Sequence, residues 1–203
     1  MIVLDHLAVS GQTLTEATTW VEDKLGVSLQ TGGEHEVFHT HNTLLGLEDG
    51  LYLEAIAINP RAPQPDRPRW FDLDSFVGTP RLSNWIMRCG DIDQFLSRCD
   101  VDFGKPVALQ RGQLKWQMAV PDTGRLPFDN TAPAIIQWQT TKHPASGLKP
   151  SGVILKRLTI SHPQANALNK RIAPFFRDDR IKFETGQVGI SAEFGTPHGD
   201  RFF

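Results

Sequence analysis

The sequence has little cysteine and no long apolar run. Cys89 and Cys99 are its two cysteines. A helix expected between them would hold them about 12 Å apart or more. That separation is too long for a disulfide bridge, so we expect free thiols. Because no run of about eighteen apolar residues occurs, we expect no transmembrane helix and no membrane partner.

The sequence also lacks an excess of charge of either sign. The formal net charge of the 203 residues is −2 and the basic residues are scattered, so we do not expect nucleic acid as a partner. The N-terminus enters a strand pattern directly, with Asp5 and His6 inside its apolar run. This argues against a signal peptide and makes the cytoplasm the expected location.

Several common catalytic motifs are missing as well. The sequence shows no glycine-rich phosphate loop, no CxxC-type zinc spacing and no serine nucleophile elbow. The residues with chemical potential are instead histidines, carboxylates and tryptophans spread over strand-like segments. The composition, 39% hydrophobic and 22% charged, is that of an ordinary globular protein with a sizeable core.

Residues 1–60 form the clearest structural unit. Residues 2–9 have a strand pattern, and Thr13 with Glu16 makes a capping box at the start of a helix. A short strand near 27–30 and a GGEH loop follow. The chain then forms a hairpin whose Asp49-Gly50 pair has favoured turn chemistry. His6 lies on the first strand and Glu54 on the last.

The register of this hairpin is open from sequence alone. A two-residue turn places Leu45 opposite Glu54 and brings His41 to the face of Glu54. A three-residue loop places Leu44 opposite Glu54 and brings Asn42 there instead. A one-residue slip exchanges the two faces of a strand, so the choice decides which residue accompanies Glu54.

The order strand, helix, strands recurs twice. Residues 61–81 are a proline-rich linker, residues 82–142 a second βαβββ unit, and residues 153–203 a shorter, partial third unit. Together we expect one compact domain. Aligning the units by their strand-to-helix junctions places Trp85 at the position of His6, and Gln137 at that of Glu54.

These motifs resemble a known superfamily. The unit with LDHLAV on its first strand and YLEAIA on its fourth resembles the vicinal oxygen chelate (VOC) superfamily. The hairpin segment together with PRWFDLD, PRLSNWIMRCGDID and RGQLKW resembles its bacterial glyoxalase-like subfamily. The resemblance implies an α+β fold in which paired βαβββ modules form a cupped mixed β-sheet, with a partial third βαββ module. It also implies that modules pair within a chain or between chains, so a homodimer is a further expectation.

The resemblance also implies a divalent metal inside the cup. In the superfamily a histidine on a first strand and a glutamate on a fourth strand ligate the metal, usually from each of two modules. His6 and Glu54 match one pair, and His41 supplies a third ligand if the first register holds. Such mixed ligands suit Fe, Mn, Ni or Zn. Because Trp85 and Gln137 replace the second pair, we expect the metal to be weakly bound or absent.

Two functions follow as expectations. The first is a metal-assisted enzyme, of lyase, isomerase or dioxygenase type, acting on a small oxygenated molecule with Glu54 and Gln137 as catalytic residues. The alternative is a metal-free protein that binds a small molecule in the same cup. In either case the expected substrate contacts are Asn42, Trp85, Arg111 and Trp116. His35 and His39 are expected to be loop histidines.

Overall fold

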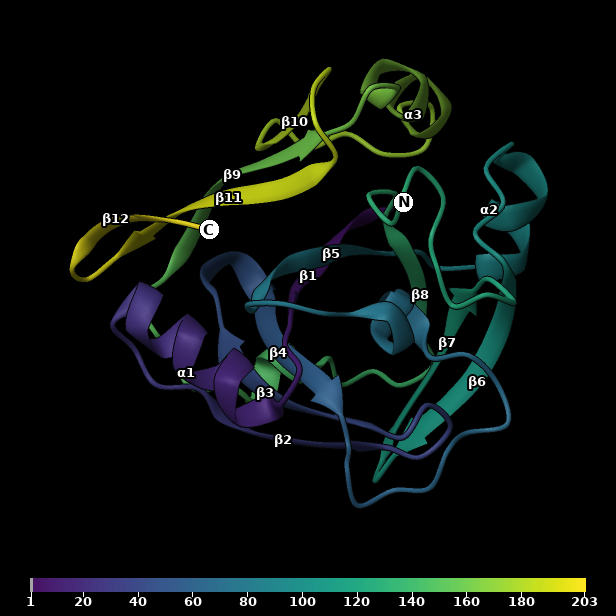
Figure 1. Ribbon diagram of the computed structural model, residues 1–203. Coiled ribbons are helices and arrows are strands. Elements are labelled where there is room, and N and C mark those ends of the chain that lie inside the picture. Colours follow the sequence, from purple (N-terminus) through teal and green to yellow (C-terminus); the bar gives the residue numbers. More distant parts are fainter. Residues whose placement is uncertain (1) are drawn as a thin grey trace.

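The computed structural model describes residues 2–203 and contains two β-sheets (Figure 1). The larger sheet has eight strands in the order β2-β3-β4-β1-β5-β8-β7-β6. The strands are β1 Val3–Ser10, β2 Gln30–His35, β3 Thr40–Gly46, β4 Tyr52–Ile58, β5 Arg81–Arg88, β6 Lys105–Arg111, β7 Leu114–Val120 and β8 Ala134–Trp138.

The larger sheet is made of two modules with the same strand order. In the first, β4 lies parallel to β1 and leads outward to β3 and β2; in the second, β8 lies parallel to β5 and leads outward to β7 and β6. β1 and β5 join the modules antiparallel. The sheet curls strongly, so that the edge strands β2 and β6 contact each other (Figure 1). We call its concave face the cup.

Helices cover the convex face. α1 (Leu14–Leu25) starts at the predicted capping box, in which Thr13 and Glu16 satisfy each other's backbone N–H groups, and ends at the left-handed Gly26. Its buried residues Ala17, Val21 and Leu25 pack against this face. α2 (Ile92–Arg98) occupies the matching position in the second module, with Asp91 as its N-cap.

The third segment forms a second sheet of four strands, in the order β10-β9-β11-β12. Its elements are β9 Ile154–Ser161, α3 Ala165–Ile172, β10 Ile181–Glu184, β11 Gly189–Thr196 and β12 Gly199–Phe202. β10, the first strand after α3, pairs directly with β9. In the first two modules the first strands after the helix, β2 and β6, lie at the sheet edges and do not pair with β1 and β5. β12 was not expected from the sequence. This sheet packs against the convex face, where Phe176 and Phe183 lie beside Trp85.

The hairpin register is resolved by the strand pairing. Leu44 lies opposite Glu54, and Asn42 lies opposite Ile56 on the same face. The turn therefore contains more than two residues, as the short helical turn Glu48–Gly50 shows. The register with Leu45 opposite Glu54 is wrong, and Asn42 rather than His41 accompanies Glu54.

The GGEH segment is part of β2 and not a loop. Its glycines admit two side chains from elsewhere in the cup. A Cβ on Gly32 would collide with the side-chain oxygen of Asn42, and a Cβ on Gly33 would come within 2.7 Å of the Cδ of Arg111. Glycine normally weakens a strand, but here it allows a close approach that no other residue permits.

The linker between the modules covers the cup. Its segment Trp70–Ser75 buries Trp70, Phe71 and Leu73 in an apolar cluster with Ala8 and other residues of the concave face. Phe71 and Asp72 both adopt left-handed backbone conformations, with φ of 61° and 57°. Each such residue stores roughly 1–3 kcal/mol of strain, which the packing of the segment has to offset.

Two further observations complete the fold. Both cysteines are free, as expected, and no helix within residues 2–203 is long and apolar enough to cross a membrane.

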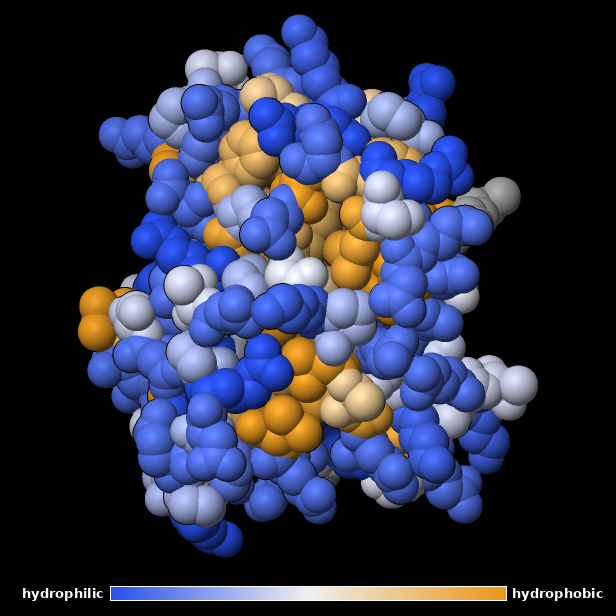
Figure 2. Space-filling view, turned by 90° about the vertical axis from the view of Figure 1, so that its right-hand side faces the viewer, coloured by the Kyte–Doolittle hydropathy of each residue, from blue (hydrophilic) through white to orange (hydrophobic). Residues whose placement is uncertain are grey.

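Figure 2 shows the side of the molecule nearest α2 and β6, where apolar side chains gather in two patches separated by a band of polar ones.

Candidate functional site

The cup floor brings together four of the predicted site residues. β1 and β4 are neighbouring parallel strands, and His6 Nε2 lies 3.6 Å from Glu54 Oε1. Asn42 donates from Nδ2 to the second oxygen of Glu54 at 2.7 Å, and Arg111 Nη1 donates to Asn42 Oδ1 at 3.1 Å. Arg111 thus reaches from the edge strand β6 to the first module. It is the last member of a row of polar contacts that runs from His6 through Glu54 and Asn42.

Asp5 adds a second carboxylate, although the regular alternation of a strand would place it on the face opposite to His6. The pairing of β1 with β5 skips a residue between Leu4 and His6, so Asp5 is the extra residue of a β-bulge. Bulges re-aim side chains near functional sites. Asp5 Oδ1 lies 2.6 Å from His6 Nδ1, while Oδ2 accepts from Trp138 Nε1 at 3.0 Å and lies 2.9 Å from His143 Nε2.

The two carboxylates hold His6 as a cation. Burial by itself lowers the pKa of His6, but hydrogen bonding to Asp5 and Glu54 outweighs burial and raises the pKa to about 9. Burial raises the pKa of Glu54, yet hydrogen bonding to His6 and the positive charge of His6 bring it below its ordinary value. The pKa of Asp5 is likewise well below its usual range, because hydrogen bonds from His143 and His6 outweigh burial.

His35 has the opposite character and stays neutral. Burial lowers its pKa to about 4, and the charge of Arg111 adds to this effect against the opposing charge of Glu54. His35 Nδ1 lies 2.9 Å from Thr40 Oγ1, and Nε2 lies 3.3 Å from Arg111 Nη1. A neutral imidazole that donates to Thr40 can therefore accept a hydrogen bond from Arg111 at Nε2.

Aromatic side chains form the walls of the cup. Tyr52 stacks on His6, with ring centroids 4.3 Å apart, and burial raises its pKa well above 10.0, so it remains a phenol. Trp116 lies beside Trp138 on the second module, and Trp70 closes the opposite side. The free volume inside is about 20 Å³, enough for about one water molecule. A larger ligand requires Arg111 or the segment 70–75 to move.

His41 does not join this cluster. It pairs with Ala57 on the face of β3 opposite to Asn42. The neighbouring Thr43 on that face bonds to Thr18 of α1. His41 is therefore separated from His6 and Glu54 by the sheet, and the structure does not support it as a third metal ligand.

Trp85 and Gln137 also lie outside the cup, so the alignment of the modules from sequence is wrong at both positions. Trp85 is fully buried on the convex face, where its Nε1 donates to the Thr131 carbonyl at 2.9 Å. Gln137 Oε1 accepts from the backbone N–H of Ile92 at the start of α2. Both residues have structural partners on the helix-covered side of the sheet, and neither lies where it could contact a ligand bound in the cup.

The strand register identifies the true counterpart of His6. Leu7 lies opposite Trp85, and a local twofold axis at this pair exchanges His6 with Asn84. The helix N-caps give the same correspondence. Thr13, the N-cap of α1, follows His6 by seven positions, and Asp91, the N-cap of α2, follows Asn84 by seven positions.

The counterpart of Glu54 follows from the parallel pairings. Ala8 pairs with Glu54 in the first module, and Ile86 pairs with Ala134 in the second. Ala134 therefore occupies the second glutamate position. Of the four positions where the superfamily places metal ligands, one holds a neutral amide and one a methyl group. Within residues 2–203 no three His, Cys, Asp or Glu side chains are placed to share a metal ion, so the donor set does not fit a tightly held metal.

Sequence reasoning missed four polar or aromatic residues of the site: Asp5, His35, Tyr52 and His143. Trp138, which the sequence suggested as a core or cup-lining residue, does line the cup. Asp5 is displaced by a bulge, and His35 belongs to a glycine-containing edge strand. His143 acts through a contact with Asp5 that is distant in sequence. A signal was present for Tyr52, which lies two residues before Glu54 and therefore shares its face.

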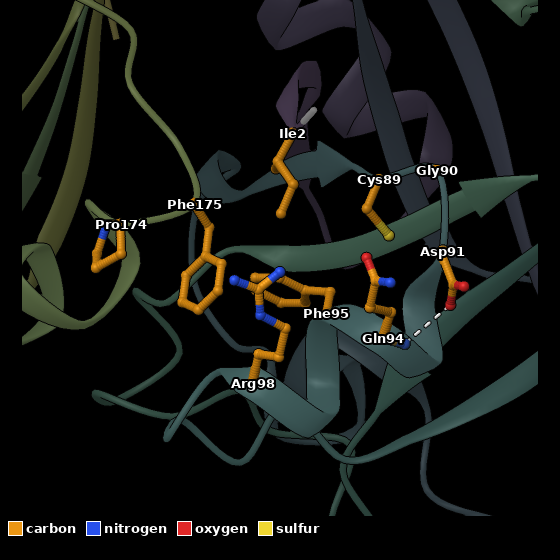
Figure 3. Close-up of a pocket in the computed structure, with 9 residues that line it drawn as sticks. All are labelled: Ile2, Cys89, Gly90, Asp91, Gln94, Phe95, Arg98, Pro174 and Phe175. Carbon is orange, nitrogen blue, oxygen red and sulfur yellow. Dashed lines mark hydrogen bonds between the residues drawn. The ribbon is translucent and has the colours of Figure 1, made fainter.

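Another cavity, of about 430 Å³, lies outside the cup between α2 and the segment that follows α3 (Figure 3). Asp91 on its rim is engaged in capping α2 by its bond to the Gln94 N–H, and Arg98 lies over the ring of Phe175. Burial raises the pKa of the Cys89 thiol to about 11. The polar side chains that line this cavity, Asp91, Gln94 and Arg98, are solvent-exposed, whereas the polar cluster of the cup is buried.

Comparison with known proteins agrees with the geometry. A family model described as a glyoxalase-like domain matches residues 4–176. A hypothetical protein from Staphylococcus aureus superposes with a TM-score of 0.59 at 14% identity, covering 100% of this chain and 84% of the other. Methylmalonyl-CoA epimerase from Mycobacterium tuberculosis superposes with a TM-score of 0.43 at 18% identity, covering 71% of this chain and 91% of the other. None of the curated proteins matches the sequence.

Proposed function

Because this chain belongs to the glyoxalase-like domain family of the VOC superfamily, we propose that it binds a small oxyanion, such as a carboxylate, in the cup without a tightly held metal. One observation carries the proposal. Among residues 2–203, no carboxylate lies within ion-pairing distance of the half-buried Arg111, whose contacts inside the cup are the neutral Asn42 and His35. A guanidinium in such a place is suited to a bidentate oxyanion.

The other charges support this assignment. The protonated His6 and Arg88, whose Nη1 lies 3.6 Å from Asp5 Oδ2, together balance the negative charges of Asp5 and Glu54. Arg111 therefore supplies the remaining positive charge of the floor. An oxyanion that bonds to Arg111 would lie beside Glu54 and His6, a carboxylate and an imidazolium that can accept and donate a proton. The site is thus equipped for proton transfer on the bound molecule as well as for binding.

The experiment is a calorimetric titration of butanoate, pentanoate and hexanoate into the wild type and into Arg111→Met. The buffer contains a chelator. We expect binding to the wild type and a loss of about 10- to 100-fold in Arg111→Met, the range for one charged hydrogen-bonding partner. Arg98→Met is the matched control, because Arg98 lies beside the cavity outside the cup. Equal binding to wild type and Arg111→Met, or none to the wild type, would contradict the proposal.

A further inference from the structure

Asn84 is an unexplained polar group on the cup floor. It pairs with Ala8 across β1 and β5, and therefore shares the concave face with His6. Its diagonal neighbour on β1 is His6, which places the two residues about 7–8 Å apart. Ala8 lies between Asn84 and Glu54 in the sheet, and its methyl group projects only a short distance into the cup.

The amide of Asn84 is fully buried and has no partner. Its exposure is 0%, and neither Oδ1 nor Nδ2 makes a hydrogen bond. Within residues 2–203 no other buried side chain has two unpartnered polar atoms. Leaving a buried donor or acceptor unsatisfied costs about 1–3 kcal/mol each. An apolar residue at this position would avoid that cost, which points to a partner from outside the chain.

We propose that Asn84 is the second anchor of the ligand, and that the ligand carries an amide-like edge a few ångströms from its oxyanion. The inference rests on the proposed function, since Arg111 holds the oxyanion end. Asn84 presents a donor and an acceptor side by side, and the complementary group is one that offers an acceptor and a donor in the same arrangement. Primary carboxamides, lactams and the edges of planar heterocycles have this chemistry.

The segment Trp70–Ser75 packs over the part of the cup that holds this anchor. Phe71 and Leu73 belong to the same apolar cluster as Ala8, the cross-strand partner of Asn84. Phe71 also lines a cavity of about 350 Å³ on the outer side of the segment. Part of the backbone strain at Phe71 and Asp72 would be released if the segment withdrew to admit a ligand, which reduces the free-energy cost of that movement. In this proposal, withdrawal of the segment connects the cavity beside Phe71 with the floor of the cup, and the ligand enters along that path.

The test uses matched pairs of probes of equal chain length. Succinamate, glutaramate and adipamate carry a terminal carboxamide, whereas butanoate, pentanoate and hexanoate end in a methyl group. Each is titrated into the wild type, into Asn84→Leu, which has the same branched shape without hydrogen-bonding groups, and into the control Gln137→Leu. Gln137 is an amide of the same sheet that bonds to the start of α2.

We expect at least one amide probe to bind the wild type tenfold or more tightly than its methyl partner, and Asn84→Leu to remove this preference. The Tm of ligand-free Asn84→Leu should equal or exceed that of the wild type, because a buried unpartnered amide is removed. Gln137→Leu should lower the Tm and keep the preference. In nitrogen-15 NMR spectra, the side-chain amide signals of Asn84 should shift with the amide probes only.

The outcomes separate this inference from the proposed function. Equal, Arg111-dependent binding of amide and methyl probes would overturn the role of Asn84 while leaving the oxyanion site intact. A clear fall in Tm for ligand-free Asn84→Leu would show a structural partner and would also overturn it. Absence of binding by all six probes would contradict the oxyanion site and, with it, the second anchor.

Discussion

At the scale of single residues, the cup is organised by the chain of charges Asp5, His6 and Glu54. Two buried carboxylates on either side of one imidazole explain why His6 is protonated although it is only 3% exposed. Breaking such a buried cluster by removing one member leaves uncompensated charge, which is strongly destabilising. The same arrangement orients His6, because Asp5 holds Nδ1 and leaves Nε2 facing Glu54 in the cup.

This arrangement predicts a dependence of stability on pH. The pKa of His6 is about 9 in the folded protein and about 6.5 when unfolded. A raised pKa stabilises the fold fully below pH 6.5, and the contribution disappears as the pH rises through 9. The unfolding free energy of the wild type relative to His6→Asn should therefore fall between pH 6.5 and 10, by on the order of 3 kcal/mol.

Chemical denaturation across this pH range is the measurement. In Asp5→Asn the loss of relative stability should begin at lower pH, because the main partner of His6 has lost its charge. A difference between wild type and His6→Asn that is constant from pH 6.5 to 10 would show that His6 is not held as a cation.

At the scale of elements, strand register separates structural residues from ligand-facing ones. Trp85 lies on the convex face of β5 and Trp116 lines the concave side of β7. Trp85→Ala should lower the unfolding free energy by about 3–5 kcal/mol, the usual range for a buried tryptophan. The milder Trp85→Phe should leave the affinity for pentanoate unchanged.

Trp116→Phe is the comparison for this prediction. It removes part of the cup wall and should weaken pentanoate binding more than it affects unfolding, as measured by calorimetry and denaturation. The register of β5 would be contradicted if Trp85→Phe weakened binding and Trp116→Phe did not.

The elements also show how far sequence reasoning extends. The order of helices and strands in the first two modules and the capping box at Thr13 follow from local patterns and were predicted. The bulge at Asp5 and the offset that puts Asn84 rather than Trp85 on the cup face were not. A one-residue shift exchanges the faces of a strand, and such shifts depend on hydrogen bonding between strands and not on the composition of one strand.

At the scale of the whole molecule, the three segments share one core. The apolar cluster on the convex face contains Val9 of the first module, Trp85 of the second, and Leu158 and Phe194 of the second sheet. The cup has a separate apolar cluster, contributed by both modules and covered by the linker. The site thus lies on one face of the sheet, and the main stabilising core lies on the other.

The central proposal is that this cup, which retains half of the superfamily's metal-ligand set, works without a tightly held metal. Calorimetric titration with Mn(II), Fe(II), Ni(II) and Zn(II) tests it most directly, on the wild type, Glu54→Gln and Asn84→His. Asn84→His is informative because it places a third strong donor opposite His6 across the local twofold axis.

We predict no sub-micromolar binding to the wild type and tighter binding of Ni(II) or Zn(II) to Asn84→His, since each added imidazole ligand strengthens a site for these ions. Sub-micromolar binding to the wild type that Glu54→Gln abolishes would contradict the account and identify the cup as a metal centre.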